Sequence, residues 1–176
     1  MSRPRDSNRK HIVVIRHAKS SWDDSSLADH DRPLSKRGRN ALPRLRDHIE
    51  ALGLPPDRVL CSSSRRTRET LDGIRPLLRR KVVVDLDPNL YAASAEKLAT
   101  ELRRLDDHVR TVFLIAHNPG VEDLVDLLAV DPASSGSSID KFPTGAVAVL
   151  SFAGPWSSLQ PRCAELESFW LPRQSR

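Results

Sequence analysis

The sequence predicts an α/β fold, a three-layer sandwich in which a mostly parallel central sheet is flanked by helices. Short apolar runs alternate with longer amphipathic stretches, which is the pattern of strand and helix units around a parallel sheet. The first run, residues 12–15, has four consecutive β-branched side chains and suits a strand that is covered on both faces. A second apolar run, residues 111–116, repeats this design later in the chain.

Local signals place the other elements. A helix is expected over residues 36–52, because apolar residues recur at spacings of three and four between an N-cap at Ser35 and a terminating Gly53. We expect further helices from the serine cap at 62–64 to about residue 80, at 94–105 and at 121–128. We expect further strands at 58–61, 81–85, 145–152 and 165–171, with a Ser-rich loop at 131–138 and a turn at 141–144.

The length and composition fit one domain. With 176 residues, 39% of them hydrophobic, the chain can bury one sizeable core but not two. Residues 1–10 have no apolar side chain after Met1 and carry several cations, so we expect a disordered basic arm before a single domain at 11–176. The arm lacks the apolar core of a signal peptide, and no stretch approaches the ~18 apolar residues of a membrane helix. We therefore expect a cytoplasmic protein without a membrane partner.

The charge pattern points to an anionic substrate. The net charge is +5, but acidic residues interleave with the cations and no nucleic-acid-reading motif stands out, so we expect no nucleic-acid partner. A basic surface raises the local concentration of phosphate esters and phosphoproteins. The two cysteines have no zinc-binding spacing and fit reduced thiols. We expect a monomer or weak dimer.

The end of the first strand carries the most informative pair, Arg16 and His17. In open α/β folds ligands bind at the carboxyl edge of the sheet, where these residues would emerge. A neighbouring guanidinium disfavours the imidazolium form, so His17 is expected to be a nucleophile with a free nitrogen lone pair. The planar fork of Arg16 matches two phosphate oxygens at once. The alternative is that Arg16 and His17 are only a basic pair in a solvated loop. A catalytic role needs a second group that converges on them. The run 111–116 offers one, because it is also followed by a histidine, His117.

Three separated motifs resemble the histidine phosphatase superfamily, the phosphoglycerate mutase-like group. They are Arg16-His17-Ala18, the segment 62–66 with Thr70, and the segment 116–119. The first motif, together with segment 32–38, is similar to the small SixA-type phosphohistidine phosphatase branch. The resemblance covers roughly residues 11–152.

The resemblance implies roles for residues outside the first strand. Arg66 matches the second phosphate-binding arginine of the family, and its place in the first turn of a helix lets the helix N–H groups face the same anion. His117 matches a histidine that stabilises phosphoryl oxygens, and Asn118 beside it is assigned to substrate binding. In the larger family an amide often follows the tryptophan of the first loop, whereas Asp23 follows Trp22 here and would repel phosphate.

These residues together predict a metal-independent phosphatase without a cofactor, acting through a phosphohistidine on His17. No clear general acid is present; Asp87 is the nearest carboxylate and the candidate acid, with Asp29 and Asp31 as further candidates. An imidazole leaving group needs less help from an acid than an alkoxide does, which favours a phosphohistidine protein as substrate. A small phosphate ester with an unidentified Asp acid and a phospho-ligand binding module without turnover are the alternatives.

Overall fold

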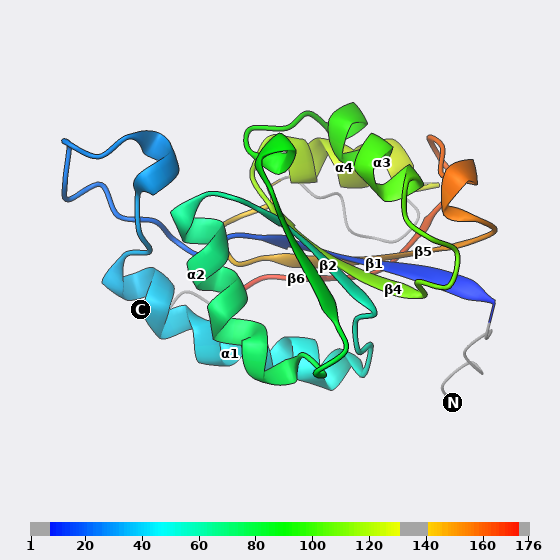
Figure 1. The fold of residues 1–176 in the computed structure, drawn as a ribbon, viewed down its shortest axis with the longest axis horizontal. Helices are drawn as coiled ribbons and strands as arrows, with labels where there is room; N and C mark the ends of the chain where they lie inside the picture. The colour runs from blue at the N-terminus through cyan, green and yellow to red at the C-terminus, as the bar shows by residue number, and fades with distance from the viewer. Residues whose placement is uncertain (1–7, 131–140, 173–176) are drawn as a thin grey trace.

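A six-stranded sheet runs through the middle of the molecule and carries helices on both faces (Figure 1). The structure is a computed structural model that describes residues 8–130 and 141–172. The strand order is β3-β2-β4-β1-β5-β6. The first four of these are parallel, β5 is antiparallel to β1, and β6 is antiparallel to β5. The strands are β1 (Arg9–Arg16), β2 (Arg58–Ser62), β3 (Val83–Asp87), β4 (Thr111–Ala116), β5 (Val147–Ala153) and β6 (Glu165–Trp170).

The helices form the two outer layers, with α1 and α2 on one face of the sheet and α3 and α4 on the other (Figure 1). They are α1 (Lys36–Leu52), α2 (Arg65–Ile74), α3 (Ala95–Arg103) and α4 (Gly120–Leu128). Four short 3-10 turns accompany them: η1 (Asp29–Asp31), η2 (Arg75–Leu77), η3 (Pro88–Leu90) and η4 (Trp156–Ser158). Serine side chains cap three helices by accepting a backbone N–H from the first turn. The predicted three-layer α/β fold is confirmed.

The β-branched residues of β1 pack into the core on both faces of the sheet. Ile12 and Val14 are buried in the core under α3 and α4, whereas Val13 and Ile15 are buried in the core under α1 and α2. Alternation along the strand directs successive side chains to opposite faces, so all four contribute to the core. This explains why the central strand is apolar without interruption.

Several expected boundaries are wrong, including the end of the helix expected at 94–105 and the start of the strand expected at 145–152. The helix expected to reach residue 80 ends at Ile74, because Pro76 lacks the backbone N–H that the helix needs and the chain continues as the 3-10 turn η2. Strand β3 lies two residues later than expected, which places Asp87 in the strand and not in the following loop.

The expected disordered arm is also too long. Strand β1 starts at Arg9, and both Arg9 and Lys10 pair with β5. The Lys10 side chain is buried, and its Nζ donates to the backbone oxygens of Asp107 (2.7 Å) and Val109 (3.2 Å). The domain therefore begins before residue 11. Residues 1–7 of the arm and the Ser-rich loop at 131–138 lie outside the described residues.

The topology brings the carboxyl ends of β1, β2 and β4 to one edge of the sheet, because these three strands are parallel neighbours. The loop after β1 leaves this edge and is held against α1 at Gly38, where any Cβ atom would collide with the backbone oxygen of Lys19. Within the described part of the chain, no helix is both long and apolar enough to cross a membrane.

Candidate active site

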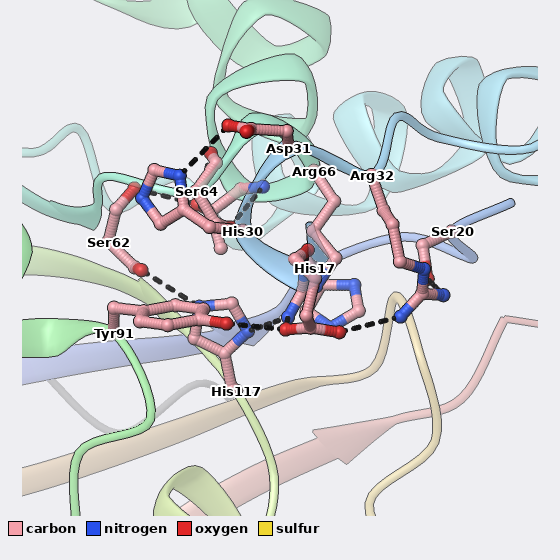
Figure 2. Close-up of polar contacts among 12 residues, drawn as sticks. His17, Ser20, His30, Asp31, Arg32, Ser62, Ser64, Arg66, Tyr91 and His117 are labelled. Atoms are coloured by element: carbon pink, nitrogen blue, oxygen red, sulfur yellow. Dashed lines mark hydrogen bonds and ion pairs between the residues drawn. The ribbon is translucent and has the colours of Figure 1, made fainter. Parts of the chain in front are cut away.

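Two histidines face each other at the carboxyl edge of the sheet. The pairing of β1 with β4 places Arg16 opposite Ala116, so His17 and His117 leave the sheet side by side. Their ring centroids lie 5.2 Å apart, and each residue is only 6% exposed. Figure 2 shows the side chains of Arg66 and Tyr91 reaching the same place. The predicted convergence of the two strand-end histidines is present in the structure.

The ring of His17 is held in one tautomer. Its Nδ1 lies 2.7 Å from the backbone oxygen of Ala18, which can only accept, so Nδ1 carries the proton and Nε2 keeps its lone pair. The pKa of His17 is lowered to about 3, mainly because the ring is buried. The hydrogen bond to the Ala18 carbonyl opposes this shift, and charge repulsion from His117, Arg66 and Arg16 adds to it. The His17 ring is therefore neutral and oriented at ordinary pH, as the predicted nucleophile would need to be. The sequence argument named the neighbouring Arg16, whereas burial is the larger cause.

The second histidine is also neutral and is connected to β2 and α2. Burial lowers the pKa of His117 to about 4, with repulsion from Arg66 as the next cause. Arg66 Nη2 lies 3.4 Å from His117 Nδ1, and His117 Nε2 lies 2.8 Å from Ser62 Oγ. With Arg66 donating to Nδ1, the ring proton sits on Nε2 and points to Ser62. Both ring nitrogens of His117 are thus occupied, and its Nδ1 lies against the expected phosphate-binding arginine, Arg66.

Arg66 reaches the pocket from the first turn of α2, as expected. The side chain of Ser64 caps this helix by accepting from the Thr67 N–H, which sets the direction of the first turn. Thr70, one turn later, accepts from the N–H of Ala18 at 3.0 Å and donates to the backbone oxygen of Arg66 at 2.7 Å. Thr70 therefore joins the peptide after His17 to the helix that carries Arg66.

Arg16 and Asn118 meet at the turn before β5. Arg16 Nη1 donates to the backbone oxygen of Phe142 at 2.8 Å, and Asn118 Nδ2 donates to the same oxygen at 3.0 Å. Asn118 Nδ2 also donates to Glu122 at 3.1 Å, so both of its N–H groups are in use. Neither N–H of Asn118 is left for a phosphoryl oxygen in this arrangement, and its assignment to substrate binding stays a prediction. Arg16 Nε is buried and, among the described residues, has no hydrogen-bond partner.

A carboxylate lies among the cations of the site. Asp29, in η1, receives hydrogen bonds from Tyr91 Oη (2.5 Å), Arg32 Nη1 (2.9 Å) and Arg66 Nη2 (3.0 Å). The backbone oxygen of Asp29 also accepts from Arg66 Nη1 at 2.6 Å. The bond from Tyr91 is the main cause that holds the pKa of Asp29 well below its usual range, with Arg32 and Arg66 contributing. Asp29 is therefore ionised.

Sequence reasoning missed Arg32 and Tyr91 as members of the site. Arg32 stacks its guanidinium 3.2 Å from the ring centroid of Trp22 and donates to Ser20 and Ser21. It lies in the 32–38 segment that carried the resemblance, which was a usable signal. Tyr91 is the single tyrosine of the chain but has no motif around it, so nothing in the sequence assigned it a role.

The other predicted carboxylates point elsewhere. The Asp87 carboxylate accepts from the backbone and side-chain amides of Asn89 (2.8 and 3.0 Å) and caps η3. Asp31 lies 3.3 Å from His30 Nδ1, and its side chain is 61% exposed. Of the three candidate acids, Asp29 is the one whose contacts include a residue of the predicted phosphate site. Among residues 8–130 and 141–172, no three metal-ligating side chains gather at one place.

A neutral buried histidine at the edge of a parallel sheet, with arginines and a second histidine around it, defines an α/β protein with a cationic site that suits a phosphoryl group. A model of the histidine phosphatase superfamily (branch 1) matches residues 12–108. The chain is also 36% identical over 165 residues to the uncharacterized protein Rv1276c of Mycobacterium tuberculosis, covering 90% of this chain and 100% of that protein. The chain belongs to the histidine phosphatase superfamily, as its motifs indicated.

Other relatives and solved structures agree with this assignment. The uncharacterized chloroplastic protein At3g52155 of Arabidopsis thaliana is 32% identical over 162 residues, covering 87% of this chain and 72% of that one. A structure from Nakamurella multipartitia, described as a candidate phosphohistidine phosphatase SixA, superposes with a TM-score of 0.81 at 24% identity over 94% of this chain and 98% of that one. The protein histidine phosphatase SixA complexed with tungstate has a TM-score of 0.74 at 22% identity, covering 92% and 97%. At these identities the structures show a shared fold.

Proposed function

We propose that this protein is a phosphatase that transfers the phosphoryl group of its substrate to His17 and then to water, and that its substrates are phosphohistidine proteins. The observation that carries the proposal is the state of His17: a buried ring with Nδ1 bound to the Ala18 carbonyl, a pKa lowered to about 3 and a free Nε2. A ring held in this way needs no general base before it attacks phosphorus.

Each neighbour of His17 supplies part of the transition-state stabilisation. Nε2 attacks phosphorus in line with the leaving group, and negative charge spreads over the three equatorial oxygens. Arg16 and Arg66 supply cationic donors at these oxygens, and His117 Nδ1 holds Arg66 in place. Because the donors are fixed by their own partners before substrate arrives, little reorganisation is needed at the moment of reaction. Water then hydrolyses the phosphohistidine.

Two observations favour a phosphohistidine protein over a small ester. The carboxylate nearest the pocket, Asp29, is ionised by its hydrogen bonds and so cannot give a proton to an alkoxide leaving group. An imidazole leaves without such help when its other nitrogen is protonated. The fold likeness to a protein named as a histidine phosphatase SixA, solved with the oxyanion tungstate, supports the same choice.

The test is time-dependent phosphate release from a panel of phosphohistidine protein, phosphotyrosine peptide, phosphoglycerate and p-nitrophenyl phosphate. We expect the phosphohistidine protein and p-nitrophenyl phosphate to be hydrolysed well and phosphoglycerate poorly. A preference for phosphoglycerate would identify a small-ester phosphatase. Tight phosphate binding without release from any member would identify a phospho-ligand binding module.

A further inference from the structure

Asp29 stands out because it places a negative charge in a site built to bind an anion. Its carboxylate accepts from Arg66 Nη2 at 3.0 Å and from Arg32 Nη1 at 2.9 Å. Its backbone oxygen accepts from Nη1, the other terminal nitrogen of Arg66. A carboxylate so close to a bound phosphoryl dianion weakens its binding, so its presence calls for a compensating function.

The direction of attack tells which part of the substrate meets Asp29. His17 is buried, whereas the Asp29 side chain is 51% exposed and lies on the solvent side of the site. In-line displacement places the leaving group on the side of phosphorus opposite the nucleophile, which is the side open to solvent. The leaving group therefore lies on the side of the site where Asp29 and Tyr91 are.

The carboxylate can still accept one further hydrogen bond. A carboxylate has about four acceptor positions on its two oxygens. Tyr91 and Arg66 both donate to Oδ2, while Oδ1 accepts from Arg32 alone. The free acceptor position is therefore on Oδ1, the oxygen that is not shared with the phosphate-binding arginine.

Resting on the phosphatase function proposed above, we propose that Asp29 is a specificity-determining residue that selects substrates with a cationic leaving group, the protonated imidazole of phosphohistidine being the example. The ring nitrogen that is not bonded to phosphorus carries its N–H to Oδ1 of Asp29. Leaving groups with a carboxylate or a second phosphate are repelled from the same position.

The bond changes balance without an added acid. The lone pair of His17 Nε2 forms the new P–N bond, and the electrons of the substrate P–N bond return to the ring nitrogen that held phosphorus. Because the other nitrogen of that ring is protonated beforehand, a neutral imidazole departs and no proton moves. Asp29 stays ionised throughout and acts by its charge.

The experiment compares the wild-type protein with Asp29→Asn on phenyl phosphates that carry a para trimethylammonium, a neutral or a carboxylate group. Asparagine keeps an oxygen for Tyr91 and leaves the backbone contact with Arg66 intact. We expect kcat/KM to fall about 3- to 10-fold for the cationic substrate and to rise by about the same factor for the anionic one, the size of a unit-charge interaction near water. Intrinsic reactivity cancels, because each substrate is compared only with itself.

Asp31→Asn is the matched control, because it removes the same charge from the same 3-10 turn while Asp31 pairs with His30. It should change the cation-to-anion selectivity by less than about twofold. An equal change for all three substrates in Asp29→Asn would overturn the proposal and show that Asp29 only positions Arg66. A loss that follows leaving-group pKa and not leaving-group charge would overturn it in favour of an acid.

Failure of the proposed function gives a different result. If the wild type released no phosphate from these three substrates, from phosphohistidine protein or from p-nitrophenyl phosphate, the phosphatase proposal would fail while charge selection stayed measurable. Equilibrium binding of the three corresponding phenylphosphonates, which lack the scissile bond, then measures the charge selection directly. Wild-type preference for the cationic phosphonate, lost in Asp29→Asn, would support the role of Asp29, and equal preference in both proteins would refute it.

Discussion

The backbone N–H of Ala18 donates to the Oγ1 atom of Thr70 at 3.0 Å, 52 residues further along the chain. The carbonyl oxygen of Ala18 accepts from His17 Nδ1 at 2.7 Å. Ala18 is thus held at its N–H by α2 and in turn holds the ring of His17. Because Arg66 lies one turn before Thr70 on the same helix, one hydrogen-bonded connection joins the His17 ring to Arg66.

Thr70→Val should destabilise the fold. Thr70 is fully buried, so valine leaves the Ala18 N–H without its acceptor, at a cost of about 1–3 kcal/mol in the free energy of unfolding. Urea denaturation measures this difference. The control is Thr100→Val, whose hydroxyl makes an exposed helix contact with the backbone of Glu96 and whose loss should cost less than about 0.5 kcal/mol. Equal losses in the two variants would contradict the connection described above.

His17→Ala should abolish turnover and leave the fold intact. Only binding and electrostatics remain without the nucleophile, so the rate should fall by several powers of ten. The wild type, quenched in alkali during turnover, should carry acid-labile phosphate on His17, because a phosphoramidate survives base better than acid. Activity within about tenfold of wild type, or label on another residue, would show that a different group attacks phosphorus.

The pH dependence of kcat/KM should lack the histidine step expected near pH 6.5. The neutral ring is the active form, and with its pKa lowered to about 3 it stays fully present as the pH falls from 8 to 5. The measurement uses a substrate whose second phosphate ionisation is known, so that this ionisation can be divided out. A remaining loss of activity centred near pH 6.5 would mean that His17 is not buried in this way.

The lowered pKa of His17 should also make the free energy of unfolding depend on pH. Between pH 6.5 and about 3 the unfolded chain binds a proton at residue 17 that the folded chain does not, so the free energy of unfolding falls as the pH falls through this window. The contribution is at most about 1.4 kcal/mol per pH unit. Urea denaturation at pH 7 and pH 5 should therefore show a smaller pH effect in His17→Asn than in the wild type. The same slope in both would contradict the shift.

How much the sequence could predict depended on how local each signal was. The positions of His17 and His117 at strand ends follow from apolar runs that stop abruptly. The serine cap places Arg66 in the first turn of α2, whereas its role came from the family resemblance. The contact of Asp29 with Arg66 and Tyr91 joins three segments that are distant in the sequence. No periodicity in the sequence indicates these contacts, because they depend on the strand order of the sheet and on the path of the loop after β1.

Lys10 shows why the start of the domain was misplaced. A lysine among other cations indicates solvent, but its apolar stem can be buried when the ammonium finds acceptors. Here those acceptors are the backbone oxygens of Asp107 and Val109, which lie far along the chain. The composition of residues 1–10 could not reveal them.

Removal of divalent metal should not change activity. In the proposed mechanism the charge on the phosphoryl oxygens is met by Arg16 and Arg66, so magnesium or zinc has no step to supply. Activity after EDTA treatment and desalting should equal that of the untreated protein, and vanadate should inhibit competitively. Loss of activity that added magnesium or zinc restores would refute this mechanism.

The last prediction concerns the leaving group. A site without a proton donor exposes the full leaving-group pKa in its barrier, so p-nitrophenyl phosphate should be cleaved well and glycerol phosphate poorly. General acid catalysis is worth about 10² to 10⁴ in rate, which sets the size of the difference. The Asp87 carboxylate already accepts two hydrogen bonds from Asn89, so Asp87→Asn should leave the dependence on leaving-group pKa unchanged. A flat dependence in the wild type that becomes steep in Asp87→Asn would identify Asp87 as the acid and make a small phosphate ester the better substrate.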